Sequence, residues 1–442
     1  MKILEKSLEK KSGRTFAPSG SKFMIYFVDD MNMPEVDEYG TVQPHQIIRQ
    51  FMDYRHWYDR TKLTAKDIKN CQFVACMNPT AGSFTIDPRL QRHFCSFAVN
   101  YPSDESLFTI YNTILVQHLQ SHTAKFPPQH LQLASALVSM GLTLHSRMIQ
   151  CFLPTAIKSH YTFNLRDLAN IYQGILFATH DTCPEPVDLA RLYVHESFRV
   201  YGDKLVNEVD QENFRKLFRE VFKKTIDELD DIKVFKEPLI YCHFATGLSD
   251  SKYMPINAWS ELSTLLADAQ AGYNDLIGSI NLVMFEDAMA HICRINRIIE
   301  GPRGNALLIG VGGSGKQSLA RLAAYISSLS VTQIQLRRGY TISDMKADLS
   351  ALYVKVGVKN IHSMFLLTDA QVADESFLVL VNDILASGDL MELFSSDEID
   401  CIANAVRNEV KQMGMLDSNE NCWKHFVEKI RRMLKVRDLT LV

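Results

Sequence analysis

The nine residues from Gly310 to Ser318 constrain the fold more than any other segment of this chain. They read Gly-Val-Gly-Gly-Ser-Gly-Lys-Gln-Ser and lie between a short apolar run at 306–309 and an amphipathic helical pattern at 317–328. Glycines let consecutive backbone N–H groups turn around an anion, the next helix presents its positive N-terminal end, and Lys316 adds a point charge. The segment therefore predicts an α/β fold with a nucleotide triphosphate site.

One position departs from the usual pattern of such a loop. The Ser or Thr that normally binds Mg²⁺ after the lysine is Gln317 here, and the hydroxyl comes one residue later, at Ser318. Asp369 ends an apolar run at 363–368 and is the natural acidic ligand of that Mg²⁺. The predicted nucleotide-binding residues are Gly310, Gly312, Gly313, Ser314, Gly315, Lys316, Gln317, Ser318 and Asp369.

No carboxylate follows Asp369 directly, because Ala370 and Gln371 come next and the next acid is Asp374. An amide can position a water molecule but cannot accept its proton. The sequence therefore predicts slow or absent hydrolysis at this site.

A second acidic strand end lies far upstream, at Asp29-Asp30 after an apolar run at 22–28. That run and the one at 306–309 are continuous, which is typical of strands buried on both faces. Asp29 is a predicted Mg²⁺ ligand and Asp30 the predicted water-activating carboxylate, although an acidic turn would give the same pair. Two acids that each end an apolar strand, Asp29 and Asp369, favour two copies of one unit.

Four further polar residues are candidates for nucleotide chemistry. Asn78 ends the next apolar run, after a helical stretch at 44–58, and either orients a water or initiates a turn with Pro79. Arg89 and Arg92 are either surface residues or the cations that reach a neighbouring subunit's phosphate in ring ATPases. Arg166 lies in a helical region and could sense a phosphate. The predicted catalytic residues are Asp30, Asn78, Arg89, Arg92 and Arg166.

The rest of the chain carries structural patterns. Residues 1–21 are polar and predict a helix end and a loop without a core. From about 103 to 235 the apolar spacing is helical, and the charge-dense stretch 203–236 is interpreted as a solvated amphipathic helix. Apolar runs at 332–336 and 363–368 predict further strands of the second α/β segment.

Composition excludes several classes of protein. The chain has 47 Lys plus Arg against 51 Asp plus Glu and 46% hydrophobic residues, so it predicts a soluble globular protein without nucleic-acid or membrane partners. Its nine cysteines predict reduced thiols in the cytosol, and Cys71, Cys76 and His93 match no zinc spacing. We expect neither secretion nor membrane insertion, since no signal peptide or apolar run of about 18 residues occurs.

These motifs together resemble the motor region of axonemal dynein heavy chains, most closely the outer-arm β-type. The resemblance covers about Phe16 to Val436. The segments that carry it are Val28-Asp29-Asp30-Met31-Asn32-Met33-Pro34, Tyr39-Gly40-Thr41-Val42-Gln43-Pro44, Trp57-Tyr58-Asp59-Arg60, Cys76-Met77-Asn78-Pro79-Thr80, Arg89-Leu90-Gln91-Arg92-His93-Phe94, Phe163-Asn164-Leu165-Arg166-Asp167-Leu168, Gly310 to Ser318, Thr368-Asp369-Ala370-Gln371-Val372 and Asn421-Cys422-Trp423-Lys424.

In that family, AAA+ modules within one polypeptide form a ring, so the resemblance implies P-loop NTPase (AAA+) modules with parallel sheets and an intervening all-helical lid. It implies that 1–102 is the C-terminal part of a third module's α/β core without its Walker A loop. Residues 103–235 would be the helical lid, 236–300 a helical connection, and 301–442 the N-terminal α/β part of a fourth module. Residues 437–442 replace the segment that would carry this module's sensor Asn.

The resemblance also implies roles and partners. Asp29, Asp30, Asn78 and Arg166 would serve the third module's nucleotide, and Arg89 or Arg92 would reach the second module's. The cofactors would be ATP and Mg²⁺, and the partners the rest of the ring and the intermediate, light intermediate and light dynein chains. Microtubules would be met only through regions absent here, and the location would be cytoplasm, cytoskeleton and the axoneme of cilia.

The expected function is that of regulatory modules in a motor that moves cilia or flagella, with ATP binding and little hydrolysis by this chain, which alone cannot move on microtubules. The alternative is a non-catalytic scaffold fragment that associates with other dynein chains without using nucleotide. An unrelated AAA+ remodelling enzyme would need complete modules, and the sequence disfavours it.

Overall fold

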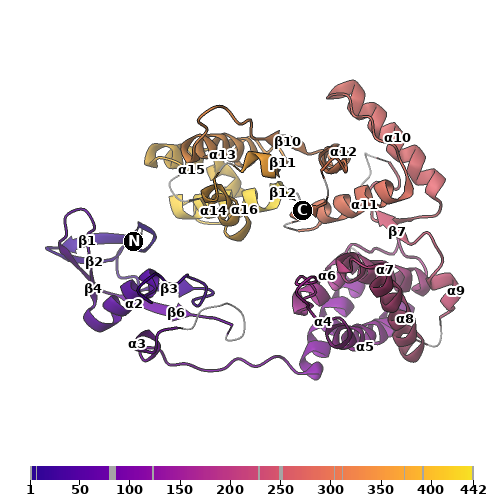
Figure 1. Cartoon of the computed structure of the whole chain (residues 1–442), viewed down its shortest axis with the longest axis horizontal. Helices are drawn as coiled ribbons and strands as arrows, with labels where there is room; N and C mark the ends of the chain where they lie inside the picture. The colour runs from indigo at the N-terminus through magenta and orange to yellow at the C-terminus, as the bar shows by residue number, and fades with distance from the viewer. Residues whose placement is uncertain are drawn as a thin grey trace. The chain divides into compact units, whose positions relative to one another are not determined.

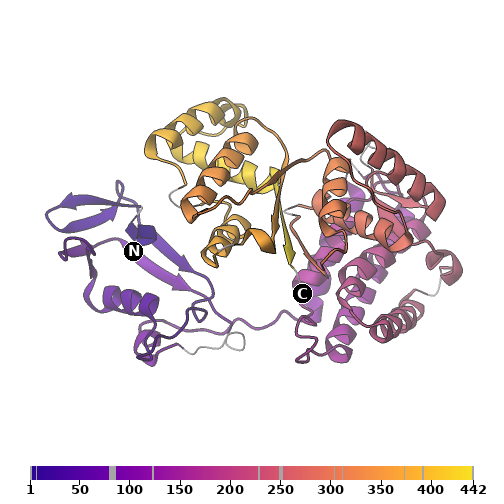
Figure 2. The same cartoon turned by 45° about the horizontal axis from the view of Figure 1, so that its top comes forward.

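The computed structural model describes the chain apart from a few short segments, and its contacts divide it into two units, Met1–Tyr101 and Pro102–Val442. Figures 1 and 2 show the elements of both units. Outside the described residues lie 1, 6, 79–85, 122–123, 227–228, 248–251, 303, 311, 373, 391–392 and 441–442, together with the side chains of 2, 3 and 437–440. Three residues of predicted motifs, Pro79, Thr80 and Val311, are among them.

The first unit is built around a pair of parallel strands. β3 (Met24–Val28) lies beside β6 (Cys71–Ala75), with Val28 opposite Ala75. α2 (Gln43–Tyr54) covers one face of this pair through Phe51, which packs edge-on against Phe73. A second sheet has the order β1-β2-β5-β4. Its strands are β1 (Leu8–Ser12), β2 (Thr15–Pro18), β4 (His56–Tyr58) and β5 (Ala65–Ile68), and the short helices of the unit are α1 (Lys2–Glu5) and α3 (Pro88–Gln91).

Three sequence predictions for strands and loops were wrong. β3 is only half-buried, and on one face, since Ile25 and Phe27 on the other face are 59% and 65% exposed. β9 (Ala306–Ile309) alternates in the same way, with Ile309 61% exposed. Residues 1–21 contain the β1–β2 hairpin, in which Ala17 is buried, rather than a loop without a core.

The helical prediction for 103–235 is confirmed. Six helices and a short 3-10 turn occupy the described part of that stretch and enclose one apolar core. On α8, Phe214, Phe218 and Phe222 are buried at steps of four residues beneath a charged outer face, as an amphipathic helix requires. The elements are α4 (Asp104–Gln120), α5 (Pro128–Cys151), α6 (Leu165–Ile175), α7 (Pro186–Val200), η1 (Gly202–Lys204), α8 (Glu208–Thr225) and α9 (Asp231–Val234).

A buried ion pair joins α7 to α11 (Glu286–Glu300). Arg297 on α11 donates to both carboxylate oxygens of Glu196 on α7, with Nε at 3.1 Å from Oε1 and 2.9 Å from Oε2. The Tyr253 hydroxyl donates to Glu196 Oε1 at 2.6 Å, and Glu196 has no exposed surface. Burial alone would lower the pKa of Arg297, but the charge of Glu196 holds this pKa above its ordinary value.

Between this helical region and the second sheet lie a small ribbon and two helices. β7 (Ile240–Cys242) pairs antiparallel with β8 (Met254–Ile256). α10 (Trp259–Leu276) follows, and α11 then leads into the second α/β segment. Among the described residues, no helix is both long and apolar enough to cross a bilayer.

The second α/β segment is a fully parallel sheet with the order β10-β11-β12-β9. The strand predicted at 332–336 lies two to three residues earlier, as β10 (Ser330–Gln333). The strand predicted at 363–368 is β11 (Ser363–Thr368), which is buried throughout. β12 (Leu434–Thr440) lies between β9 and β11, so the departure from the family pattern at 437–440 does not remove this strand. Its helices are α12 (Lys316–Ile326), α13 (Ile342–Gly357), α14 (Ser376–Ala386), α15 (Ser396–Gln412) and α16 (Asn419–Met433).

Candidate nucleotide site

The segment Gly310–Ser318, called the glycine loop below, connects the end of β9 to the first turn of α12. Gly313 and Gly315 have φ angles of +81° and +76°, a left-handed region in which glycine is strongly favoured. Lys316 begins the helix, and its ammonium donates to the carbonyl of Gly310 and, at 3.4 Å, to Ser314 Oγ. The loop is therefore folded back on itself with its lysine over the turn.

The N-terminus of α12 faces the same loop. Gly315 is its N-cap, so the N–H groups of Gln317 and Ser318 lie in the first turn, where the helix itself offers no acceptor for them. Ser318 is half-buried, whereas Gln317 is exposed. A helix start of this kind, with a lysine and glycine N–H groups, is suited to a phosphate group.

Asp369 lies at the sheet edge that carries this loop. It directly follows β11 and begins the short 3-10 turn η2 (Asp369–Gln371). One strand, β12, separates β11 from β9, and adjacent strands lie about 4.8 Å apart, so the two strand ends are roughly 10 Å apart. That spacing leaves room for phosphates and a cation between Lys316 and Asp369.

The residues after Asp369 are engaged in structural hydrogen bonds. Gln371 Oε1 accepts from the N–H of Thr368 at 2.9 Å, and its Nε2 donates to the carbonyl of Ile334 at 2.5 Å. Asp374 caps the following turn, where its Oδ1 accepts from the N–H and the hydroxyl of Ser376. Both ends of the Gln371 amide are therefore used away from the loop.

The upstream acids lie at the equivalent edge of the first unit. Asp29 Oδ1 accepts from the N–H of Asp30 at 3.1 Å and from the Cys76 thiol at 3.0 Å. The hydrogen bond to Asp29 raises the pKa of this thiol. The Asn78 carbonyl accepts from Asn32 Nδ2 at 3.2 Å. The structure thus brings Asp29, Asp30 and Asn78 together at the carboxyl ends of β3 and β6.

The three candidate arginines are all exposed. Arg92 lies 3.5 Å from the Asp53 carboxylate, which also contacts His93 at 3.0 Å. Arg89 donates its backbone N–H to Asp87, the N-cap of α3. Arg166 lies in the first turn of α6, in the second unit, so it belongs to a different unit from Asp29 and Asp30.

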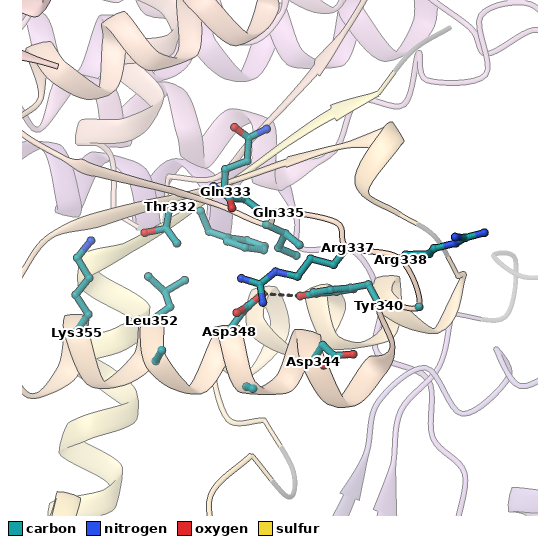
Figure 3. A pocket seen from close by; sticks show the side chains of 15 residues that line it. Thr332, Gln333, Gln335, Arg337, Arg338, Tyr340, Asp344, Asp348, Leu352 and Lys355 are labelled. Atoms are coloured by element: carbon teal, nitrogen blue, oxygen red, sulfur yellow. Dashed lines mark hydrogen bonds between the residues drawn. The ribbon is translucent and has the colours of Figure 1, made fainter. Parts of the chain in front are cut away.

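A cavity of about 570 Å³ lies in the groove between β10 and α13 (Figure 3). Its lining includes Gln333, Tyr340 and Asp348, and the Tyr340 hydroxyl donates to Asp348 at 2.7 Å. None of the predicted nucleotide-binding residues lines this cavity. The candidate nucleotide site is therefore defined by the loop and not by the cavity.

One segment in contact with the glycine loop, 280–284 between α10 and α11, was not predicted from the sequence. A methyl group of Leu282 lies 3.7 Å from the point that a Cβ on Gly315 would occupy. The apolar run Leu282-Val283-Met284-Phe285, just before α11, is a signal that could have identified this segment.

Comparison with known families agrees with this geometry. A family model described as "P-loop containing dynein motor region D4" matches residues 280–437, which include the loop, Asp369 and all four strands of the second sheet except the end of β12. A second model, "P-loop containing dynein motor region", matches residues 1–102. A third, "AAA+ lid domain", matches residues 137–236 in the helical region.

Individual relatives match nearly the whole chain. "Dynein axonemal heavy chain 17" of Homo sapiens is 59% identical over 98% of the chain, and "Dynein beta chain, ciliary" of Heliocidaris crassispina is 58% identical over the same share. "Dynein beta chain, flagellar outer arm" of Chlamydomonas reinhardtii is 46% identical. The chain spans 10% of the length of each of these relatives. Because the chain matches models of the dynein motor region and is 46–59% identical to these axonemal heavy chains, it belongs to the axonemal dynein heavy chain family.

Proposed function

We propose that this chain is part of an axonemal dynein motor and that the loop Gly310–Ser318 binds ATP with Mg²⁺. The observation that carries the proposal is the position of the loop between β9 and α12, with Asp369 at the same sheet edge. Lys316 and the N–H groups of the first helical turn would hold the phosphates. Asp369 and Ser318 would hold the cation, which neutralises phosphate charge when bound.

Bound ATP is expected to be hydrolysed slowly. The position after Asp369 has no carboxylate, and the Gln371 amide is bonded to Thr368 and Ile334. Without a general base near the attacking water, proton transfer in the transition state lacks its usual assistance. A module of this kind suits a regulatory role, since its state changes through nucleotide binding more than through turnover.

We further propose that Asp29, Asp30 and Asn78 serve a second nucleotide, in a module completed by sequence outside this chain. Asp29 would bind Mg²⁺, Asp30 would activate water and Asn78 would orient it. Arg166 would sense the phosphate of this nucleotide. Either Arg89 or Arg92 would reach the nucleotide of the preceding module; their exposed side chains support this.

The proposed division is 1–102 for the third module's core, 103–235 for its lid, 236–300 for the connection and 301–442 for the fourth module. The matches of family models to 1–102, 137–236 and 280–437 support it. In cells, these modules would act within the heavy chain in the axoneme of cilia or flagella. The rest of the ring and the intermediate, light intermediate and light dynein chains would be their partners, and microtubule contact would occur through other regions.

Calorimetric titration of the chain with Mg-ATP tests the proposal. Lys316→Ala is expected to abolish binding, and Asp369→Asn to remove its dependence on Mg²⁺. Lys359→Ala, which changes an exposed lysine just after α13, serves as the control and should bind like the wild type. Equal affinity in Lys316→Ala would contradict the proposal. An unchanged melting temperature with Mg-ATP would favour the scaffold alternative, because a ligand of the native state must stabilise it.

A further inference from the structure

α10 packs directly against α12, the helix that follows the glycine loop. The ring of Tyr325 on α12 stands edge-on to Tyr273 on α10, with ring centres 5.6 Å apart. The Tyr325 hydroxyl lies 2.8 Å from the point that a Cβ on Gly272 would occupy, so glycine at this position leaves the room that the hydroxyl needs. α10 therefore has a fixed position beside the candidate nucleotide site.

The last turns of α10 also hold the segment that follows the helix. Asn274 Oδ1 accepts from the N–H of Ile280 at 2.7 Å, and Asn274 Nδ2 donates to the carbonyl of Ile280 at 3.2 Å. Gln270 Nε2 donates to the same carbonyl at 2.8 Å. Both main-chain groups of Ile280 are therefore bonded to side chains of α10, and we call these three hydrogen bonds the α10 clamp.

The clamped segment leads to the glycine loop. Ile280, Leu282 and Met284 pack toward the core that α10, α11 and α12 share, whereas Val283 between them is 78% exposed. The Leu282 side chain rests on Gly315, at 3.7 Å from the position of a Cβ there. Gly315 is the N-cap of α12 and has the left-handed φ that the turn of the loop depends on.

We propose that Asn274 and Gln270 are positioning residues for nucleotide binding. By fixing Ile280, the α10 clamp keeps Leu282 against Gly315 and thereby keeps the loop in its phosphate-binding conformation. This inference rests on the proposed function, since it concerns the same nucleotide site. Neither residue needs to touch the nucleotide, because the effect passes through Leu282 to the backbone of the loop.

The test compares Mg-ATP with inorganic tripolyphosphate in calorimetric titrations of the full chain, together with thermal melting without ligand. Asn274→Ala removes two of the three clamp bonds and is expected to weaken both ligands about five- to tenfold. Gln270→Ala removes one bond and is expected to weaken both roughly two- to fivefold. The control is Asp275→Ala, an exposed neighbour on α10, which should leave both affinities unchanged.

The outcomes separate failure of the clamp proposal from failure of the proposed function. Wild-type affinity of Asn274→Ala for both ligands overturns the clamp proposal and leaves ATP binding intact. Weaker ATP binding with unchanged tripolyphosphate binding also overturns it, because the effect then lies at the nucleoside and not at the phosphate loop. A wild-type chain that binds neither ligand refutes the proposed function, and the clamp proposal with it. If Asn274→Ala shows no cooperative melting, Gln270→Ala decides by the same criteria.

Discussion

Replacing Arg297 by Met should strongly destabilise the second unit. The Glu196 carboxylate is fully buried and accepts hydrogen bonds from the Arg297 guanidinium and from the Tyr253 hydroxyl. Methionine keeps much of the aliphatic length of the arginine but removes its charge and donors. Glu196 would then be a buried anion, with the Tyr253 hydroxyl at 2.6 Å as its remaining side-chain donor among the described residues.

The expected loss follows from that burial. Removing one partner of a buried ion pair typically costs about 3–5 kcal/mol, and the remaining Tyr253 bond places Arg297→Met near the lower value, about 3 kcal/mol. Glu196→Gln should cost less, about 1–2 kcal/mol, because Arg297 is partly exposed and can reach water. The double variant should lose less than the sum of the two, since each single change leaves a partner behind.

Urea unfolding followed by circular dichroism measures these free energies. Lys216→Met on α8 is the matched control, because Lys216 lies 3.9 Å from Glu212 in an exposed pair and its loss should cost less than about 0.5 kcal/mol. A loss below about 1 kcal/mol for Arg297→Met, with an unchanged urea dependence, would refute the argument that this pair is buried and mutually dependent.

Two further predictions concern the same region. Gly174→Ala should destabilise the chain by about 1–3 kcal/mol in the same urea assay, because a Cβ there would lie 1.8 Å from Glu196 Oε2. Gly202→Ala, whose Cβ would meet Phe214 at an ordinary contact distance of 3.5 Å, should change the free energy of unfolding much less. Burial lowers the pKa of His243 to about 4, so the unfolded chain takes up the proton first and stability should fall as the pH drops from about 6.5 to 4. His243→Leu should remove about 3 kcal/mol of this loss. If stability depends on pH in this variant as it does in the wild type, His243 is not the group that takes up the proton on unfolding.

The local elements around the loop could be predicted because their signals are short-range. The glycines and Lys316 stand between a run of four apolar residues and a helical pattern, and β9 and α12 occupy those positions. Asp369 follows an apolar run in the sequence, and β11 is buried at all six positions. Parallel strands put residues at their carboxyl ends on one edge, so the grouping of Asp29 with Asn78 also follows from the sequence pattern.

Features that depend on distant partners could not be predicted. The continuous apolar run that contains Ile25 and Phe27 indicates a strand, but only the position of α2 shows which face is covered. From the sequence, a glutamate in a helix, such as Glu196, is expected to face solvent. Its partner Arg297 lies 101 residues away along the chain. The bonds from Asn274 to Ile280 span six residues, yet they need the turn after α10 to fold back first.

The central position of β12 sets the order in which this sheet can form. β9 has β12 as its neighbour among the described strands, and the Val436 N–H bonds to the Asn305 side chain across 131 residues of sequence. During synthesis, β9, which leads to the glycine loop, therefore gains this hydrogen-bonded partner only after residues 434–440 have been made. Such distant pairing slows folding, since the loop-closure entropy must be lost before the contacts form. The glycine loop would then gain its phosphate-binding conformation only after β12 has been synthesised and has joined the sheet.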